Sequence, residues 1–122
     1  MAGKPRRTRT FEASLDRALA KYPRSRDSVE STLEAIAANP GLGSRYPGFV
    51  EFQVFKARVA LKEYGLSERK GLRVIYLVAT SGSVVPILAY KKGEPAKEHE
   101  VKARAVRALK QIIEELQDPE GE

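Results

Sequence analysis

One stretch, Gly71-Leu72-Arg73-Val74-Ile75-Tyr76-Leu77-Val78, limits most strongly what this chain can fold into. A glycine opens it, and β-branched and aromatic residues dominate it, which is typical of a buried central strand. Its one charged residue is Arg73. A guanidinium in such a strand needs a carboxylate, a bound phosphate or an open cleft, because an unpaired buried charge is costly. The function of the chain therefore depends on which of these partners Arg73 has.

Two amphipathic helices are predicted before this strand. Apolar residues recur at helical spacing over residues 11–22 and again over residues 29–37, which indicates one buried face on each helix. Pro23 ends the first helix, and Asn39-Pro40-Gly41 ends the second. Because the connection between them is short, they should form an antiparallel hairpin.

Two further strands and a last helix are predicted around the central strand. In residues 54–61 apolar and charged residues alternate, so Lys56 and Arg58 project to one side. Residues 84–90 form the third strand, and Pro86 predicts that this strand lies at an edge or carries a bulge. An apolar stripe over residues 97–117 predicts the final helix.

The predicted fold is α+β, with an N-terminal helical hairpin packed on a small twisted antiparallel sheet of three to four strands and a C-terminal helix. Residues 10–117 form a single domain. Residues 1–9 are expected to be a basic, disordered tail, residues 62–70 a polar, mobile loop, and residues 118–122 an acidic tail.

Composition excludes several classes of function. The chain has no cysteine and a single histidine, His99, which rules out disulfides, thiolate catalysis and cysteine-bound zinc and leaves almost no material for a Ser-His-Asp triad. No close carboxylate pair and no glycine-rich phosphate loop is present, so neither a metal nor another cofactor is expected. No apolar run is long enough to span a bilayer, and we expect a cytoplasmic protein without membrane association.

Positive charge is concentrated in the predicted sheet. The net charge is +6, and residues 53–96 hold 8 Lys or Arg against 3 Asp or Glu. This pattern fits a polyanionic partner such as nucleic acid, or a solvated surface that is merely rich in lysine, and charge alone does not separate the two. Cations without metals can still cleave RNA, since the ribose 2′-hydroxyl supplies the nucleophile and arginine and lysine neutralise the pentavalent phosphate.

The chain resembles a known family, the RelE/ParE superfamily of toxins from type II toxin–antitoxin systems. Within this superfamily it is most similar to the RelE- and HigB-like mRNA interferases. The resemblance spans about residues 9–116. It is carried by Asn39-Pro40 after the helical hairpin, Lys56-Ala57-Arg58, Gly71-Leu72-Arg73-Val74-Ile75-Tyr76 and Ala89-Tyr90-Lys91-Lys92-Gly93-Glu94.

The resemblance implies a metal-free endoribonuclease that cleaves mRNA, in some members on the ribosome, and that a cognate antitoxin neutralises in a higher-order complex. It implies catalytic roles for Arg73, Lys56, Arg58, Lys92 and Tyr90 and RNA binding by Lys91, Lys70, Arg69 and Lys62. The tyrosine that RelE has beyond the last basic residue is missing here, which makes His99 a candidate helper in proton transfer. Two alternatives stay open: a ParE-like toxin that inhibits DNA gyrase without cutting RNA, and an inactive domain that binds RNA or an antitoxin.

Overall fold

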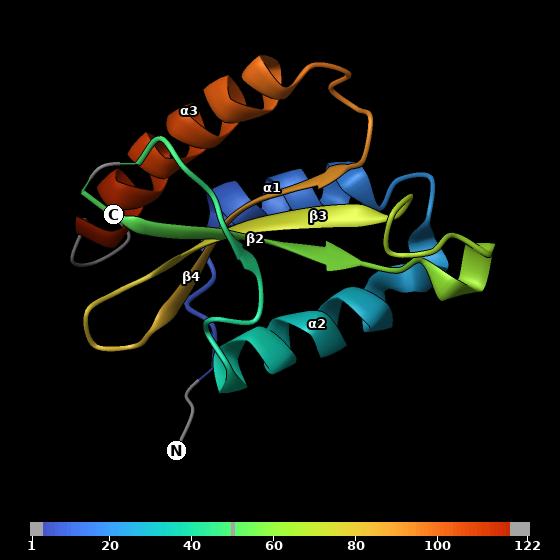
Figure 1. The fold of residues 1–122 in the computed structure, drawn as a ribbon, viewed down its shortest axis with the longest axis horizontal. Coiled ribbons are helices and arrows are strands. Elements are labelled where there is room, and N and C mark those ends of the chain that lie inside the picture. Colours follow the sequence, from blue (N-terminus) through green and yellow to red (C-terminus); the bar gives the residue numbers. More distant parts are fainter. Residues whose placement is uncertain (1–3, 50, 118–122) are drawn as a thin grey trace.

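The computed structural model describes residues 4–49 and 51–117, and within them the fold is α+β (Figure 1). The predicted tail at residues 118–122 lies outside the described part. The α-helices are α1 (Arg9–Ala18), α2 (Arg26–Ala38) and α3 (Glu98–Gln117), and two short 3-10 helices are η1 (Pro23–Ser25) and η2 (Lys62–Tyr64). The strands are β1 (Ser44–Arg45), β2 (Gln53–Val59), β3 (Leu72–Val78) and β4 (Val84–Lys91).

The four strands form one antiparallel sheet in the order β1-β2-β3-β4. This confirms the predicted class of sheet and adds the two-residue strand β1 at one edge. Strand β4 forms the other edge, and its register against β3 shifts between Ile75 and Tyr76, beside Pro86. Both features follow from the missing amide donor of proline, which an edge position or a bulge accommodates.

Helices α1 and α2 lie against one face of the sheet. Their buried residues share a core cluster with β2, β3 and β4, and the pair Arg26–Asp16 links the two helices at 2.7 Å. The cluster contains Phe11, Leu15, Leu19, Val29, Leu33, Val59, Leu61, Leu72, Val74 and Ala89. Both predicted N-terminal helices are present, but α1 ends at Ala18, ahead of the predicted end at Pro23, so proline is not what ends it.

Tyr76 ties the loop after α2 to this face of the sheet. Its side chain is fully buried and stacks on Phe55 with ring centroids 5.6 Å apart. Its hydroxyl accepts a hydrogen bond from the Gly43 amide at 2.9 Å and donates one to the Pro40 carbonyl at 2.7 Å. A tyrosine in the central strand is therefore satisfied by the loop that Asn39-Pro40-Gly41 opens.

Helix α3 covers the opposite face, and Figure 1 shows α2 and α3 on opposite sides of the sheet. Residues Val101 and Ala105 of α3 share a second core cluster with Ile75 of β3 and Leu88 of β4. The sheet therefore has helices on both faces. In the described part of the chain, no helix is both long and apolar enough to cross a bilayer.

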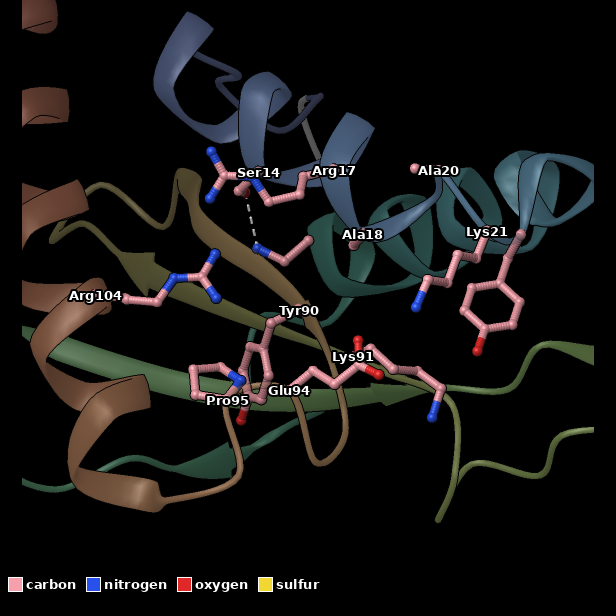
Figure 2. Close-up of a pocket in the computed structure, with 12 residues that line it drawn as sticks. Ser14, Arg17, Ala18, Ala20, Lys21, Tyr90, Lys91, Glu94, Pro95 and Arg104 are labelled. Carbon is pink, nitrogen blue, oxygen red and sulfur yellow. Dashed lines mark hydrogen bonds between the residues drawn. The ribbon is translucent and has the colours of Figure 1, made fainter.

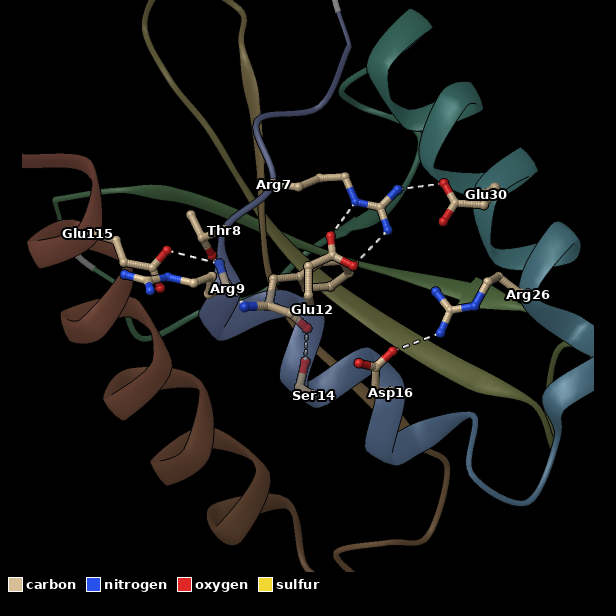
Figure 3. A network of polar contacts seen from close by, with 10 residues as sticks. Arg7, Thr8, Arg9, Glu12, Ser14, Asp16, Arg26, Glu30 and Glu115 are labelled. Atoms are coloured by element: carbon tan, nitrogen blue, oxygen red, sulfur yellow. Dashed lines mark hydrogen bonds and ion pairs between the residues drawn. The ribbon is translucent and has the colours of Figure 1, made fainter. Parts of the chain in front are cut away.

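The segment expected to be a disordered tail is instead attached to the domain over residues 4–9. The Arg6 amide donates to the Val84 carbonyl of β4, and Thr8 caps α1 by accepting from the Phe11 amide. Arg7 bridges Glu12 of α1 and Glu30 of α2 (Figure 3). Sequence reasoning missed this because the two carboxylates meet Arg7 only after the helices have packed together.

We expect Gly71→Ala to destabilise the fold strongly. A Cβ at this position would lie 1.9 Å from the Val59 carbonyl oxygen, so β2 and β3 would have to separate where they carry Arg58 and Arg73. The free energy of unfolding, measured with urea, should fall by roughly 2–4 kcal/mol.

Gly41→Ala is the matched control. Its Cβ would meet nothing closer than the Asn39 Oδ1 atom at 3.9 Å, so its effect should be neutral or stabilise by about 0.5 kcal/mol. Equal effects of the two substitutions would contradict the close strand contact at Gly71.

Candidate functional site

The strand register brings the predicted cations to one face of the sheet. Arg58 of β2 lies directly opposite Arg73 of β3, and Arg73 lies directly opposite Tyr90 of β4. Residues directly opposite each other have Cα atoms about 4.5–5.5 Å apart and point to the same side. Lys56 is two residues from Arg58 on β2, so it shares this side, and the charge of Lys92, just after β4, acts on Glu98 beside Lys56. We call the group Lys56, Arg58, Arg73, Tyr90 and Lys92 the cationic face.

The cationic face lies on the α3 side of the sheet, where Tyr90 belongs to the core cluster beneath α3 and Arg58 and Lys92 are exposed. The apolar residues of that side, Ile75 and Leu88, are buried against α3, whereas Arg58 and Lys92 are exposed and Lys56 is half-buried. Side-chain alternation within β3 does not show whether Arg73 points to the same side as Arg58 of β2. The strand register shows that it does, because the two residues are directly opposite each other. An anion can therefore reach the exposed cations without displacing the helix.

Arg73 has a partner that the sequence did not suggest. Its Nη1 atom donates to the Glu68 carbonyl at 2.7 Å and to the Leu72 carbonyl at 3.2 Å, and its Nη2 atom donates to the Arg69 carbonyl at 3.2 Å. Only 6% of the residue is exposed. Burial and the charge of Arg58 lower the pKa of Arg73, yet arginine stays charged at physiological pH.

Backbone carbonyls thus hold the Arg73 guanidinium in one orientation. An arginine has five N–H donors, and within the described residues its Nε–H and one Nη2–H remain unpaired. These two donors are not used by the protein contacts of Arg73. Arg73 is therefore both a structural and a candidate binding residue.

The loop that supplies these carbonyls, residues 62–70, is anchored rather than free. Tyr64 packs edge-on against Tyr22 with centroids 5.1 Å apart, and the Glu63 carboxylate accepts a hydrogen bond from Ser25 at 2.8 Å. These contacts with η1 attach to the domain a loop that the sequence predicts to be mobile. The side chains proposed for RNA binding, Lys62, Arg69 and Lys70, are exposed on this loop.

Sequence reasoning missed a carboxylate at the border of the cationic face. Glu98, at the start of α3, accepts a hydrogen bond from the Tyr46 hydroxyl at 2.5 Å and lies 3.5 Å from Lys56 Nζ. Burial opposes the change, but the Tyr46 hydrogen bond and the charges of Lys56 and Lys92 lower the pKa of Glu98 below its ordinary value. Glu98 is therefore ionised at neutral pH and beside the cations. The residues near Glu98 in the sequence do not indicate a site, because its partners are distant: they lie in the loop after β1, in β2 and just after β4.

The remaining predicted residues divide between the face and its surroundings. Burial, together with the charge of Glu98, raises the pKa of Tyr90 to about 12, so its hydroxyl is protonated at neutral pH. Lys91 is half-buried on the strand end. His99 is exposed and lies two residues from buried Val101, so the helical turn directs it away from the sheet.

Within residues 4–49 and 51–117 no group of three His, Asp or Glu side chains is placed to hold a metal ion. No family model, no curated protein and no solved structure matched this chain.

The contact between Tyr46 and Glu98 should make stability depend on pH. A carboxyl whose pKa is lowered in the folded state stabilises the fold above its unfolded pKa, and that contribution is lost as the pH falls through its folded pKa. The Glu98 side chain is 59% exposed, so solvent screens the interaction and we expect Glu98→Gln to cost about 0.5 kcal/mol at pH 7.

Urea unfolding at pH 7 and at pH 3 checks this, with Glu100→Gln as an exposed control on the same helix. The difference between wild type and Glu98→Gln should vanish at pH 3, and the control should show no such change. A deficit of equal size at both pH values would contradict the role of the ionised carboxylate.

Proposed function

We propose that this chain is a toxin of the RelE/ParE type that cleaves RNA without a metal ion. One observation carries the proposal: Arg58, Arg73 and Tyr90 lie in register across three strands, and Arg58 and Lys92 of this group are exposed. Among the described residues, Glu98 is the one carboxylate that forms an ion pair with a cation of this face. So many cations with one paired carboxylate fit the binding of a phosphodiester better than a structural network of ion pairs.

The arrangement of helices supports the same family. Two N-terminal helices cover one face of a small antiparallel sheet and a C-terminal helix covers the other, and this α+β arrangement is compatible with a RelE-like fold. A cytoplasmic toxin of this kind would act on mRNA, in some cases on the ribosome, and a cognate antitoxin would neutralise it by covering the cationic face.

In the proposed reaction the 2′-oxygen attacks the adjacent phosphorus, the bond to the 5′-oxygen breaks, and the products are a 2′,3′-cyclic phosphate and a 5′-hydroxyl. Glu98 accepts the proton of the 2′-hydroxyl, because it is ionised beside Lys56 and Lys92. Arg58 and Arg73 stabilise the charge on the equatorial phosphate oxygens. Tyr90, protonated at neutral pH, donates the proton that the 5′-oxygen needs, with Lys92 beside it.

The sharpest test uses Arg58→Ala. Arg58 is exposed, so its loss should leave the fold intact, whereas Arg73→Ala would also remove three hydrogen bonds that hold the loop. We expect cleavage of a labelled single-stranded RNA in the presence of EDTA to slow by roughly 100- to 1,000-fold. Mass spectrometry should find cyclic phosphate ends on the wild-type products.

Arg45→Ala is the matched control. Arg45 is an exposed arginine of the same sheet, but it pairs with Phe55 on the opposite face, so its loss should leave cleavage unchanged. His99→Ala should also retain activity. Substrate with a 2′-deoxyribose at the cleaved position should be inert.

Toxicity on expression together with an intact RNA pool would contradict cleavage and favour the gyrase-inhibiting alternative. Primer extension on cellular mRNA and an assay of gyrase supercoiling separate these two outcomes. If the chain is neither toxic nor nucleolytic, both toxin hypotheses are wrong, and the remaining alternative is an inactive domain that binds RNA or an antitoxin.

A further inference from the structure

Three arginines from two helices line one cavity outside the cationic face. Arg17 stands in the last turn of α1, and Arg104 and Arg107 stand about one turn apart on α3. All three border a cavity of about 290 Å³ between these helices. Burial and the charges of Arg17 and Arg107 lower the pKa of Arg104, which reflects mutual repulsion among the three guanidinium groups.

No carboxylate neutralises this cluster within the described residues. The ion pairs there belong to Arg7, Arg26 and Lys56, and the other polar residues of the cavity wall are Ser14 and Gln111. A positive charge at the C-terminus of α1 favours the helix dipole, which accounts for Arg17 but not for the two arginines within α3. A bound anion would offset the repulsion of all three.

A second cavity connects this cluster to the cationic face. It measures about 340 Å³, shares Ser14, Arg17 and Arg104 with the first, and extends to Tyr90 and Lys91 (Figure 2). Tyr90 is the residue directly opposite Arg73. An extended anion could therefore contact the arginine cluster and the cationic face at the same time.

The lining of the connecting cavity favours a nucleic acid over an acidic peptide. Two aromatic residues, Tyr22 and Tyr90, border it together with Lys21, Lys91 and the two arginines, and Glu94 is its one carboxylate. Aromatic rings interleaved with cations are the usual binding surface of single-stranded nucleic acid, since bases stack on the rings while the cations contact the backbone.

We propose that Arg17, Arg104 and Arg107 bind a backbone phosphate of the RNA strand, away from the phosphate that is cleaved, and that the strand runs through the connecting cavity past Tyr90. This inference rests on the proposed function for the identity of the strand. Arginine suits the site because its planar fork donates two parallel hydrogen bonds to a phosphate.

Binding of a single-stranded RNA with 2′-O-methyl riboses tests the proposal, because this RNA lacks the attacking hydroxyl and stays intact. Fluorescence anisotropy over a series of KCl concentrations gives the dissociation constant and its salt dependence. For Arg104→Ala and for Arg107→Ala we expect binding roughly three- to tenfold weaker, and a slope of log K against log salt smaller by about 0.7.

Two further variants serve as controls. Lys110→Ala removes one exposed positive charge from the same helix and borders neither cavity, so it should bind as the wild type does. Arg104→Lys keeps the charge without the fork and should retain the salt slope while losing part of the affinity. Thermal unfolding followed by circular dichroism verifies that each variant is folded.

The outcomes separate this proposal from the proposed function. Unchanged RNA binding by Arg104→Ala and Arg107→Ala, with weaker binding by Arg58→Ala, would overturn the second phosphate site and leave the cationic face in place. If RNA binding depends on Arg104 and Arg107 but ordinary RNA is not cleaved, the second phosphate site is supported and the proposed RNA cleavage is wrong. Binding of a polyglutamate peptide that depends on Arg104, with RNA binding unaffected, would overturn the site in favour of an acidic protein partner.

Discussion

The register of β2, β3 and β4 is the constraint on which the rest of the molecule depends. It sets Arg73 between Arg58 and Tyr90, and a slip of one residue would move these side chains to the face that α1 and α2 cover. Gly71 helps to hold this register, because only a residue without Cβ can approach the Val59 carbonyl so closely. The close contact and the cationic face are therefore parts of one arrangement.

Helix α3 divides its side of the sheet into two parts with different chemistry. Apolar residues of β3 and β4 and the ring of Tyr90 are buried beneath it, while Arg58 and Lys92 are exposed. The start of the helix brings Glu98 to the border, where Tyr46 and Lys56 hold it. The same helix carries Arg104 and Arg107 towards Arg17, so one element supplies both the carboxylate and most of the second cluster of positive charge.

Much of the fold could be predicted because its signals are local. Helical spacing identified the three helices, alternation identified β2, β-branched and aromatic residues identified β3, and Pro86 indicated an edge or a bulge in β4. The attachment of residues 4–9 could not be predicted, since Arg7 binds carboxylates on two helices. Glu98 escaped notice for the same reason, because its partners are distant in sequence and nothing near it marks a site.

The sequence by itself determined the class of fold, the absence of cysteine chemistry and the shared side of Lys56 and Arg58, because composition and side-chain period within one strand need no partner. Only the tertiary structure decided which way Arg73 faces and what it binds. Its guanidinium is held by the carbonyls of Glu68 and Arg69 rather than by the carboxylate that a buried charge suggests. Facing depends on the register between strands, and a backbone carbonyl carries no signature in the sequence, so neither could be deduced before the strands were paired.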